Sequence, residues 1–199
     1  MVSLTEKERE TLLILFKDLK TYYNANSMSK LLNITHVGVM KIFKRFKDEN
    51  LVTSQKIGKS IIYSLNFENS YVKQLISFLL ADEVNDKYKR WQKEFTELYK
   101  ENRIVLLYGS IIKNYKTASD IDLMVVMEKS EYDEISKTIN KKQKILPKKV
   151  HPILLTETDL INNIKDDKDS VIDIIKNAIC LYGQNKYVEL IKNARNKTI

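Results

Sequence analysis

Two apolar runs joined by a short polar segment, within residues 104–127, constrain the fold of this chain more than any other feature. The first run stops at Gly109 and Ser110, and the second begins directly after Asp120 and Asp122. Short apolar runs bounded by turn residues are typical of buried strands. Because residues i and i+2 of a strand point to the same side, we expect the two carboxylates to project together.

The paired carboxylates and the Gly-Ser turn indicate a particular chemistry. Neighbouring carboxylates repel one another unless a cation lies between them, and hard divalent cations such as Mg²⁺ prefer oxygen ligands of this kind. Gly109 allows a phosphate or another backbone to approach closely, and Ser110 offers a hydroxyl and an N–H group to phosphate oxygens. The alternative is a surface turn that carries two acids, but the apolar run directly after Asp122 favours a site.

The Gly-Ser pair, a gap of nine residues, the Asp-x-Asp pair and the flanking strands together resemble the signature of the DNA polymerase β-like nucleotidyltransferase superfamily, and most closely its minimal nucleotidyltransferases. The resemblance implies that Asp120 and Asp122 bind metal and are catalytic. It implies Mg²⁺ and ATP, or another nucleoside triphosphate, as cofactors. The residues implied to bind the nucleotide are Gly109, Ser110, Lys113, Lys116 and Ser119.

The resemblance also implies a third carboxylate on a following strand, and that position carries none here. The third expected strand, residues 150–155, contains His151 but neither Asp nor Glu. Glu157 and Asp159 lie beyond its end, where they look like first-turn acids of a helix. His151 is the nearest substitute, either as a structural residue or as a metal ligand or base. The missing acid leaves open whether the protein is an active enzyme or only binds a nucleotide.

The N-terminal third of the chain has a different pattern. Helical periodicity and capping residues predict helices at residues 4–20, 27–32 and 36–49, and β-rich runs around a glycine turn predict strands at 51–55 and 60–65. This order of elements resembles a winged helix-turn-helix DNA-binding domain. In that class the third helix enters the major groove. The residues thereby implied to contact DNA are His36, Lys41, Lys44 and Arg45 on the helix and Lys56 and Lys59 on the wing. The alternative is a solvated helix face on a domain that binds protein.

We therefore expect an α+β protein with two domains. Residues 1–68 form the winged helix-turn-helix domain, and residues 69–199 form a nucleotidyltransferase fold, a mixed sheet flanked by helices, with a helical linker and first helices at 69–101. The further expected elements are helices at 71–81, 85–100, 130–142, 157–164, 170–179 and 185–194 and a strand at 180–182.

Composition agrees with a polyanion partner, since the formal net charge is +8. A single cysteine, Cys180, and the absence of a leader or an apolar stretch of about 20 residues predict a cytoplasmic protein with no membrane partner. The predicted function is that of a DNA-binding transcriptional regulator whose second domain binds Mg-NTP. The alternative is an active enzyme that transfers NMP, plausibly AMP, to a hydroxyl group. The expected partners are double-stranded DNA, a nucleotide, a second copy of the chain and a protein.

Overall fold

The computed structural model describes residues 3–195, and the chain divides into two compact units, residues 1–79 and 80–199. The division falls inside helix α4 (Ser70–Glu83), whereas the sequence placed the domain boundary at its start. Helices and strands occur in both units, and the expected α+β class is confirmed. Among the helices described, none has both the length and the apolar character that crossing a bilayer requires.

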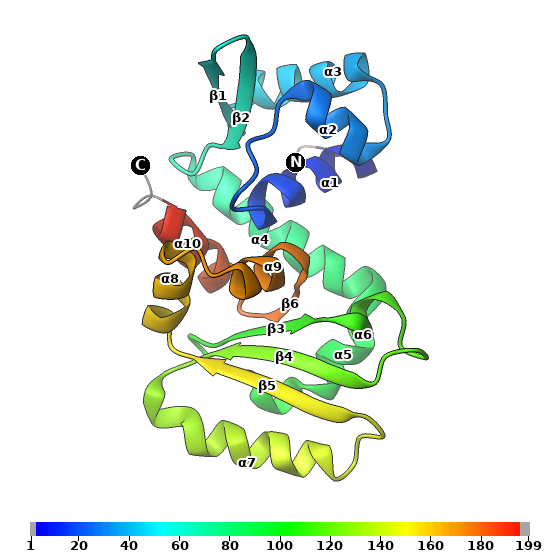
Figure 1. The fold of residues 1–199 in the computed structure, drawn as a ribbon, viewed down its shortest axis with the longest axis vertical. Helices are drawn as coiled ribbons and strands as arrows, with labels where there is room; N and C mark the ends of the chain where they lie inside the picture. The colour runs from blue at the N-terminus through cyan, green and yellow to red at the C-terminus, as the bar shows by residue number, and fades with distance from the viewer. Residues whose placement is uncertain (1–2, 196–199) are drawn as a thin grey trace. The chain divides into compact units, whose positions relative to one another are not determined.

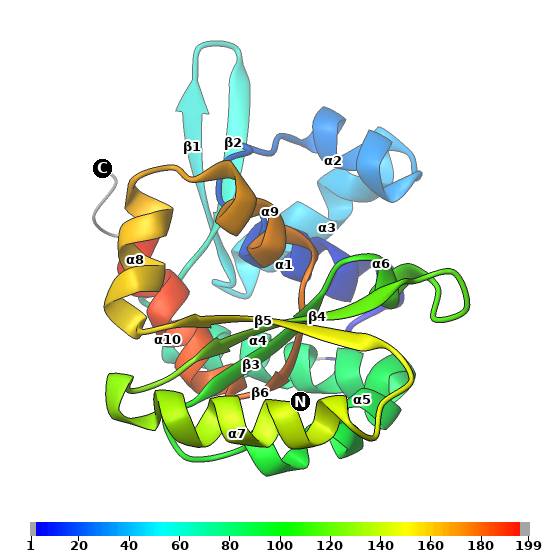
Figure 2. The same ribbon diagram turned by 60° about the horizontal axis from the view of Figure 1, so that its bottom comes forward.

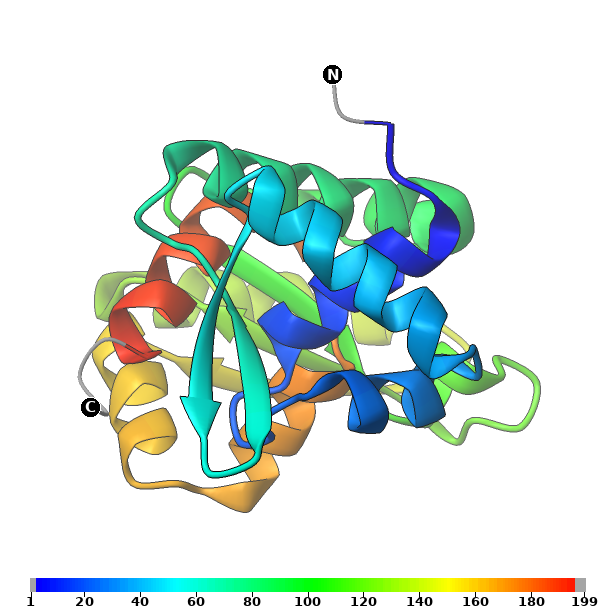
Figure 3. The same ribbon diagram turned by 90° about the horizontal axis from the view of Figure 1, so that it is seen from above.

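The N-terminal unit consists of three helices followed by a β-hairpin, and the hairpin projects from the helices as a two-stranded arm (Figures 1 and 3). The elements are α1 (Glu6–Lys17), α2 (Ala25–Leu32), α3 (His36–Asp48), β1 (Val52–Ile57) and β2 (Ser60–Leu65). Thr5 caps α1 in a capping box with Glu8, and Thr35 caps α3, as the sequence predicts. Apolar residues at helical spacing on α3 are fully buried, namely Val39, Phe43 and Phe46.

Helix α2 begins earlier than predicted. Ser27 was expected to open the helix, but the N-cap is Asn24, whose side chain accepts a hydrogen bond from the backbone N–H of Ser27 at 2.8 Å. The Ser27 hydroxyl in turn accepts from the backbone N–H of Asn24 at 3.0 Å. Two polar residues three positions apart can both serve as caps, so the sequence alone did not identify which of them begins the helix.

The hairpin is regular and packs on α3. Strands β1 and β2 pair in antiparallel register from Val52–Leu65 to Ile57–Ser60, around a turn in which Gly58 has φ +59°. The Tyr63 ring stacks on Phe43 of α3, with ring centroids 3.9 Å apart. This contact fixes the base of the hairpin against the helix that precedes it.

The C-terminal unit is built on a four-stranded mixed sheet with the order β5-β4-β3-β6 (Figure 2). The strands are β3 (Ile104–Tyr108), β4 (Asp120–Val126), β5 (Lys149–Leu155) and β6 (Ile179–Tyr182). Strand β3 runs antiparallel to β4 and β6, and β4 runs parallel to β5. Strand β5 is at an edge of the sheet, where Pro152 can be accommodated because an edge position does not need every backbone N–H.

The helices of this unit mostly lie where the sequence predicts, with two differences. They are α5 (Lys89–Glu94), α6 (Ser110–Lys113), α7 (Tyr132–Gln143), α8 (Glu157–Lys165), α9 (Asp169–Asn177) and α10 (Gln184–Arg195). The helix expected at 85–100 is a π-helical turn (Val84–Tyr88), then α5, then a 3₁₀ turn (Thr96–Leu98). The short helix α6, directly after Gly109, was not predicted.

The two faces of β4 have different surroundings. Ile121, Leu123 and Val125 belong to the core beneath the sheet, which α5 and α7 cover on one side (Figures 1 and 2). Side chains alternate along a strand, so Asp120 and Asp122 point to the opposite face. The fold therefore separates the two carboxylates from this core.

The start of β3 is fixed by a buried arginine. Arg103 is 2% exposed, and its guanidinium donates hydrogen bonds to Glu131 at 2.9 and 3.1 Å, to Glu134 at 3.0 Å and to the Leu98 carbonyl at 3.3 Å. A Cβ atom on Gly183, at the end of β6, would lie 2.1 Å from the Arg103 carbonyl oxygen. The ion pairs of Arg103 and the close approach of Gly183 to its backbone thus both hold the start of β3 in position.

Candidate functional site

The Gly-Ser turn and the acid pair are in direct contact. Tyr108 of β3 pairs with Asp122 of β4, so the turn that follows Tyr108 lies beside the second carboxylate. Gly109 has φ +79°, and a Cβ atom at this position would lie 2.1 Å from Oδ2 of Asp122. Only glycine leaves room for the carboxylate at this point, and its backbone conformation is one that other residues rarely adopt.

The structure adds a histidine to the acid pair. In the parallel register of β4 and β5, His151 stands directly opposite Asp122. Its Nδ1 atom lies 3.4 Å from Oδ2 of Asp120 and 3.8 Å from Oδ1 of Asp122. One ligand atom from each of the three side chains lies within 4.8 Å of the others. The site is partly open, because the exposed side-chain fractions are 26% for Asp120, 21% for Asp122 and 45% for His151.

The electrostatic environment of Asp122 is unfavourable to the charge of its carboxylate. Burial and the neighbouring Asp120 carboxylate raise the pKa of Asp122, although His151 opposes the shift. Burial and then the charges of Asp122 and Asp120 raise the pKa of Tyr108 to about 12. Two neighbouring carboxylates repel one another, and a cation bound between them would relieve this repulsion. Sequence reasoning did not select Tyr108, although its place directly before the Gly-Ser turn is the signal that could have found it.

The segment between the turn and the acids carries the remaining residues expected to bind nucleotide. Ser110, Lys113, Lys116 and Ser119 are all exposed. The segment folds back through backbone hydrogen bonds from Asn114 to Ser110 and from Ala118 to Asn114, both at 3.1 Å. The Lys148 ammonium also donates to the Ala118 carbonyl. The polar segment therefore begins and ends at the site, but these four side chains are exposed to solvent.

The two acids that follow β5, Glu157 and Asp159, bind other residues and not the acid pair of β4. Asp159 accepts hydrogen bonds from the backbone N–H of Thr156 at 2.9 Å and from its hydroxyl at 2.7 Å, in the capping box of α8. Glu157 pairs with Lys186 at 2.7 Å. Both act as first-turn acids of a helix, as the sequence indicates. Within the described part of the chain, His151 lies opposite Asp122, on the strand on which a third carboxylate was expected.

The donor set fits a divalent cation. Two carboxylates and an imidazole can supply three ligands from one side, and the partly open face leaves room for further ligands such as water or phosphate oxygens. The close approach of the Asp122 carboxylate to Gly109 also explains the requirement for glycine, since a larger residue would displace Asp122. The residues present therefore have the donor chemistry that a divalent cation requires.

A second candidate surface lies on the N-terminal unit. Lys41, Lys44, Lys56 and Lys59 are exposed, as the helical and strand patterns predict. His36 at the start of α3 and Lys59 of the hairpin line one hollow of about 250 Å³, together with Asn24, Ala25, Asn26, Met40, Ser60, Ile61 and Tyr63. The structure thus brings the first turn of α3 and the hairpin tip to a common surface.

Arg45 differs from the other basic residues of this set. It was expected to face outward, but its guanidinium donates hydrogen bonds to both carboxylate oxygens of Glu8, at 2.8 and 2.9 Å, to Glu49 at 2.8 Å and to the Ser3 carbonyl at 3.0 Å. Although burial opposes it, hydrogen bonds from Thr5 and Arg45 hold the pKa of Glu8 below its ordinary value. Arg45 thus joins α3 to α1, and its guanidinium is engaged within the N-terminal unit.

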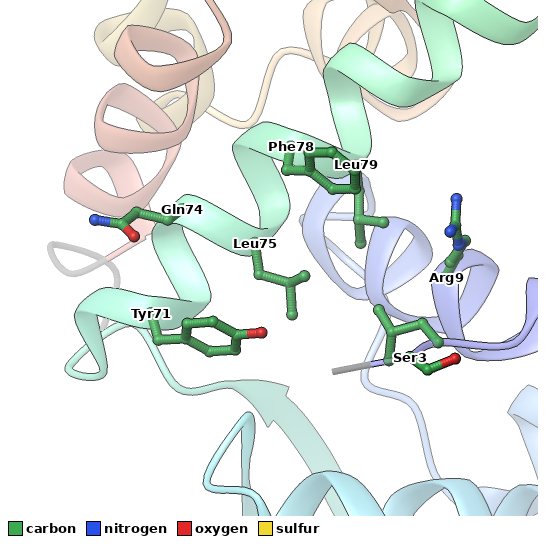
Figure 4. Close-up of a pocket in the computed structure, with 8 residues that line it drawn as sticks. Ser3, Arg9, Tyr71, Gln74, Leu75, Phe78 and Leu79 are labelled. Carbon is green, nitrogen blue, oxygen red and sulfur yellow. The ribbon is translucent and has the colours of Figure 1, made fainter. Parts of the chain in front are cut away.

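The N-terminal unit also has a larger apolar hollow, of about 470 Å³, beside α4 (Figure 4). Its lining is Ser3, Leu4, Arg9, Tyr71, Gln74, Leu75, Phe78 and Leu79. Tyr71 and Phe78 are 39% and 53% exposed, so two large apolar side chains of the lining are open to solvent. This hollow has none of the acid chemistry of the β4 site, so its size alone does not make it the functional centre.

A comparison with protein families gives a match within the C-terminal unit. A family model described as polymerase beta, nucleotidyltransferase, matches residues 92–187. This span contains all four strands of the sheet and the side chains of Asp120, Asp122 and His151. Residues 92–187 therefore carry a nucleotidyltransferase-fold domain.

Solved structures give weaker matches. A double-mutant form of ZitR from Lactococcus lactis is 14% identical, covers 72% of this chain and 75% of its own, and has a TM-score of 0.37. A cysteine-to-serine form of the same protein is 16% identical, covers 72% and 76%, and has a TM-score of 0.34. Similarity at this level carries no argument about fold or function. No curated protein matched the sequence.

Proposed function

We propose that the protein is a DNA-binding regulator whose C-terminal unit binds a nucleoside triphosphate together with a divalent cation. The nucleotide half rests on the nucleotidyltransferase-fold match and on the acid pair of β4. The DNA half rests on the basic face that α3 and the hairpin form. Nucleotide binding in one unit then provides a signal to which DNA binding in the other can respond.

A single observation carries the nucleotide half, namely the contact between Gly109 and the Asp122 carboxylate. A turn that would hold phosphates is useful only if it lies beside the residues that hold the cation, and a Cβ at Gly109 would lie 2.1 Å from Asp122. The two parts of the motif, which are separated by nine residues in the sequence, therefore meet in space.

The roles of the side chains follow from their positions. Asp120 and Asp122 would hold the cation, and Gly109 and Ser110 would accept the phosphate chain beside it. Lys113, Lys116 and Ser119 lie on the exposed segment between turn and acids, where they would neutralise or hydrogen-bond the phosphates. When bound, the cation supplies positive charge that neutralises the phosphate oxygens and the carboxylates together.

Calorimetric titration with α,β-methylene-ATP and either MgCl₂ or MnCl₂ tests this proposal on the full chain. We expect metal-dependent binding by the wild type and none by the double variant Asp120→Asn/Asp122→Asn. The control is Asp133→Asn/Asp173→Asn, which removes two exposed carboxylates from α7 and α9 and should bind like the wild type. Equal affinity in the wild type and the β4 variant would reject the nucleotide site.

DNA binding is proposed from charge and geometry. Lys41 and Lys44 lie on the exposed side of α3, and Lys56 and Lys59 lie on the hairpin, so both elements present positive charge to a phosphate backbone. His36 lies with Lys59 on one hollow and could reach a base edge or a phosphate. The net charge of +8 favours association with a polyanion. The test is the salt dependence of binding to duplex DNA, compared between the wild type and a variant without Lys41 and Lys44.

The second candidate function is nucleotidyl transfer, favoured by the placement of His151 opposite Asp122. The acceptor hydroxyl oxygen would attack the α-phosphorus, a new P–O bond would form, and the bond to pyrophosphate would break as pyrophosphate leaves. The hydroxyl proton would pass to a nearby base, for which His151 is the candidate. Release of pyrophosphate from ATP, GTP, CTP or UTP with a nucleic-acid, protein or small-molecule acceptor distinguishes this function from binding alone. No release with any acceptor favours the regulator.

We also propose that the protein forms a homodimer, because a regulator that reads two half-sites commonly does so. The exposed Tyr71 and Phe78 beside the apolar hollow give the N-terminal unit a surface that a second copy could cover. Sedimentation analysis of the wild type and of Tyr71→Ser/Phe78→Ser would report on it, and a monomeric wild type would exclude the dimer.

A further inference from the structure

We infer that His151 is a ligand of the cation held by Asp120 and Asp122, and that it makes the site select a divalent transition ion, such as Mn²⁺, over Mg²⁺. The inference rests on the proposed function, since it concerns the same site. It goes beyond that function because it assigns a third ligand and a metal preference that the two carboxylates alone do not imply.

The register of the sheet places the imidazole at the acid pair. Directly opposed residues on neighbouring strands project to the same side, and His151 is opposed to Asp122. Its Nδ1 atom faces both carboxylates, at 3.4 and 3.8 Å. At 45% exposure the ring is not held by burial in a core. The position of His151 is thus explained by the acids and not by apolar packing.

The chemistry of the donor set decides the preference. Mg²⁺ requires hard oxygen ligands, and a third carboxylate would suit it. The nearest acids along the chain cannot serve, because Asp159 is held by Thr156 and Glu157 by Lys186. An imidazole nitrogen is a softer ligand that raises affinity for first-row transition ions relative to Mg²⁺. One nitrogen and two carboxylates therefore favour Mn²⁺ and its heavier neighbours.

The competing interpretation is that His151 acts as a cation and holds the two carboxylates in place of a metal. The two interpretations predict opposite results on removal of the ring. A ligand that is lost lowers metal affinity, whereas a competing positive charge that is lost raises it. Binding of Mn²⁺ itself therefore separates them.

Pulsed electron paramagnetic resonance of Mn²⁺ bound to the full chain is the direct experiment, because a coordinated imidazole adds ¹⁴N modulation to the Mn²⁺ signal. The sequence contains only two histidines, His36 and His151, so the assignment needs only two variants. We expect ¹⁴N modulation in the wild type and in the control His36→Ala, and its loss in His151→Ala with an affinity about tenfold lower. Bound Mn²⁺ without ¹⁴N modulation in the wild type would overturn the inference before any variant is made.

Competition between MnCl₂ and MgCl₂ tests the preference. We expect the wild type to favour Mn²⁺ by about tenfold or more, and His151→Asp to retain metal binding while the ratio moves toward Mg²⁺. An unchanged ratio in His151→Asp, a higher Mn²⁺ affinity in His151→Ala, or no Mn²⁺ bound to the wild type would each overturn it. Nucleotide binding that needs the two aspartates but shows no ¹⁴N signal would overturn this inference and leave the proposed function standing.

Discussion

The two units of this protein specify their candidate sites in different ways. In the C-terminal unit, strand register and backbone contact determine the site, because Gly109 lies against Asp122 and His151 is paired opposite it. In the N-terminal unit, the periodicity of α3 and the hairpin leaves lysines on the outside, where few contacts define their positions. A site built by contact is sensitive to small changes of shape, whereas a surface built by exposure responds mainly to changes of charge.

The same substitution at a glycine of each unit should give the sharpest contrast. Gly109→Ala should abolish binding of metal and α,β-methylene-ATP, because its Cβ would displace the Asp122 carboxylate. Gly58→Ala, in the hairpin turn, also has a positive φ but meets nothing within 4 Å. We expect it to cost about 1 kcal/mol of stability from backbone strain and to leave nucleotide binding intact. Calorimetry and thermal melts measure both effects, and full nucleotide binding by Gly109→Ala would contradict the contact argument.

Two arginines allow the next comparison. Arg103→Ala leaves the Glu131 carboxylate, which is 11% exposed, with Lys100 as its remaining cationic partner, and should destabilise the C-terminal unit by about 3 kcal/mol. Arg45→Ala should have a smaller effect on the N-terminal unit, because the Arg45 side chain is 35% exposed and Glu8 keeps its hydrogen bonds from Thr5. Chemical denaturation followed by circular dichroism measures both, and similar losses from the two variants would show that burial does not set the difference.

The Arg103 pair also predicts a dependence on pH. Hydrogen bonds from Arg103 lower the pKa of Glu131 to about 2. A carboxyl with a lowered folded-state pKa stabilises the protein above its unfolded value of about 4.3 and loses this contribution as pH falls toward 2. The melting temperature of the wild type should therefore fall more between these pH values than that of Arg103→Ala. Parallel curves for the two proteins would argue against the pair.

Charge removal should distinguish the DNA surface from the rest of the molecule. Lys41→Ala/Lys44→Ala should lower affinity for duplex DNA about tenfold and reduce the slope of log affinity against log salt by about 2, since two phosphate contacts are lost. Lys137→Ala/Lys165→Ala removes the same charge from exposed positions on α7 and α8 and serves as the control. Fluorescence anisotropy at several salt concentrations gives both slopes, and equal losses in the two variants would indicate a general charge effect.

The smallest expected effect is a gain of stability. Burial and Asp120 raise the pKa of Asp122, so its ionised form opposes folding at neutral pH when no cation is bound. Asp122→Asn should therefore raise the melting temperature of the metal-free protein by a few degrees, about 1 kcal/mol. The same substitution at Asp173, an exposed position inside α9, should change little, and a lower melting temperature for Asp122→Asn would show that the carboxylate has a structural role.

Sequence reasoning succeeded where local patterns decide the structure. The buried positions Val39, Phe43 and Phe46 on α3, the caps Thr5 and Thr35, and the strands around the acid pair follow from periodicity and capping. It was less accurate where neighbouring residues compete for the same role. Asn24 and Ser27 can both cap a helix, so the start of α2 was misplaced.

Features that depend on tertiary contacts could not be predicted from the sequence. The π-helical turn Val84–Tyr88 interrupts a continuous helical pattern, and no residue there is a strong helix breaker. Arg45 fits an outward basic stripe by spacing, but Glu8 of another helix binds it. The pairing of His151 with Asp122 needs the register of two strands that are distant in the sequence. Each of these requires knowing which elements meet.

The core beneath the sheet contains Trp91, which is 6% exposed and is the only tryptophan of the chain. Excitation at the red edge of protein absorbance therefore reports almost entirely on residues 80–199. The fluorescence of Trp91 therefore reports whether the C-terminal unit unfolds separately from the N-terminal unit. Recording it beside far-ultraviolet dichroism would resolve, without any label, how far the two halves share one cooperative transition.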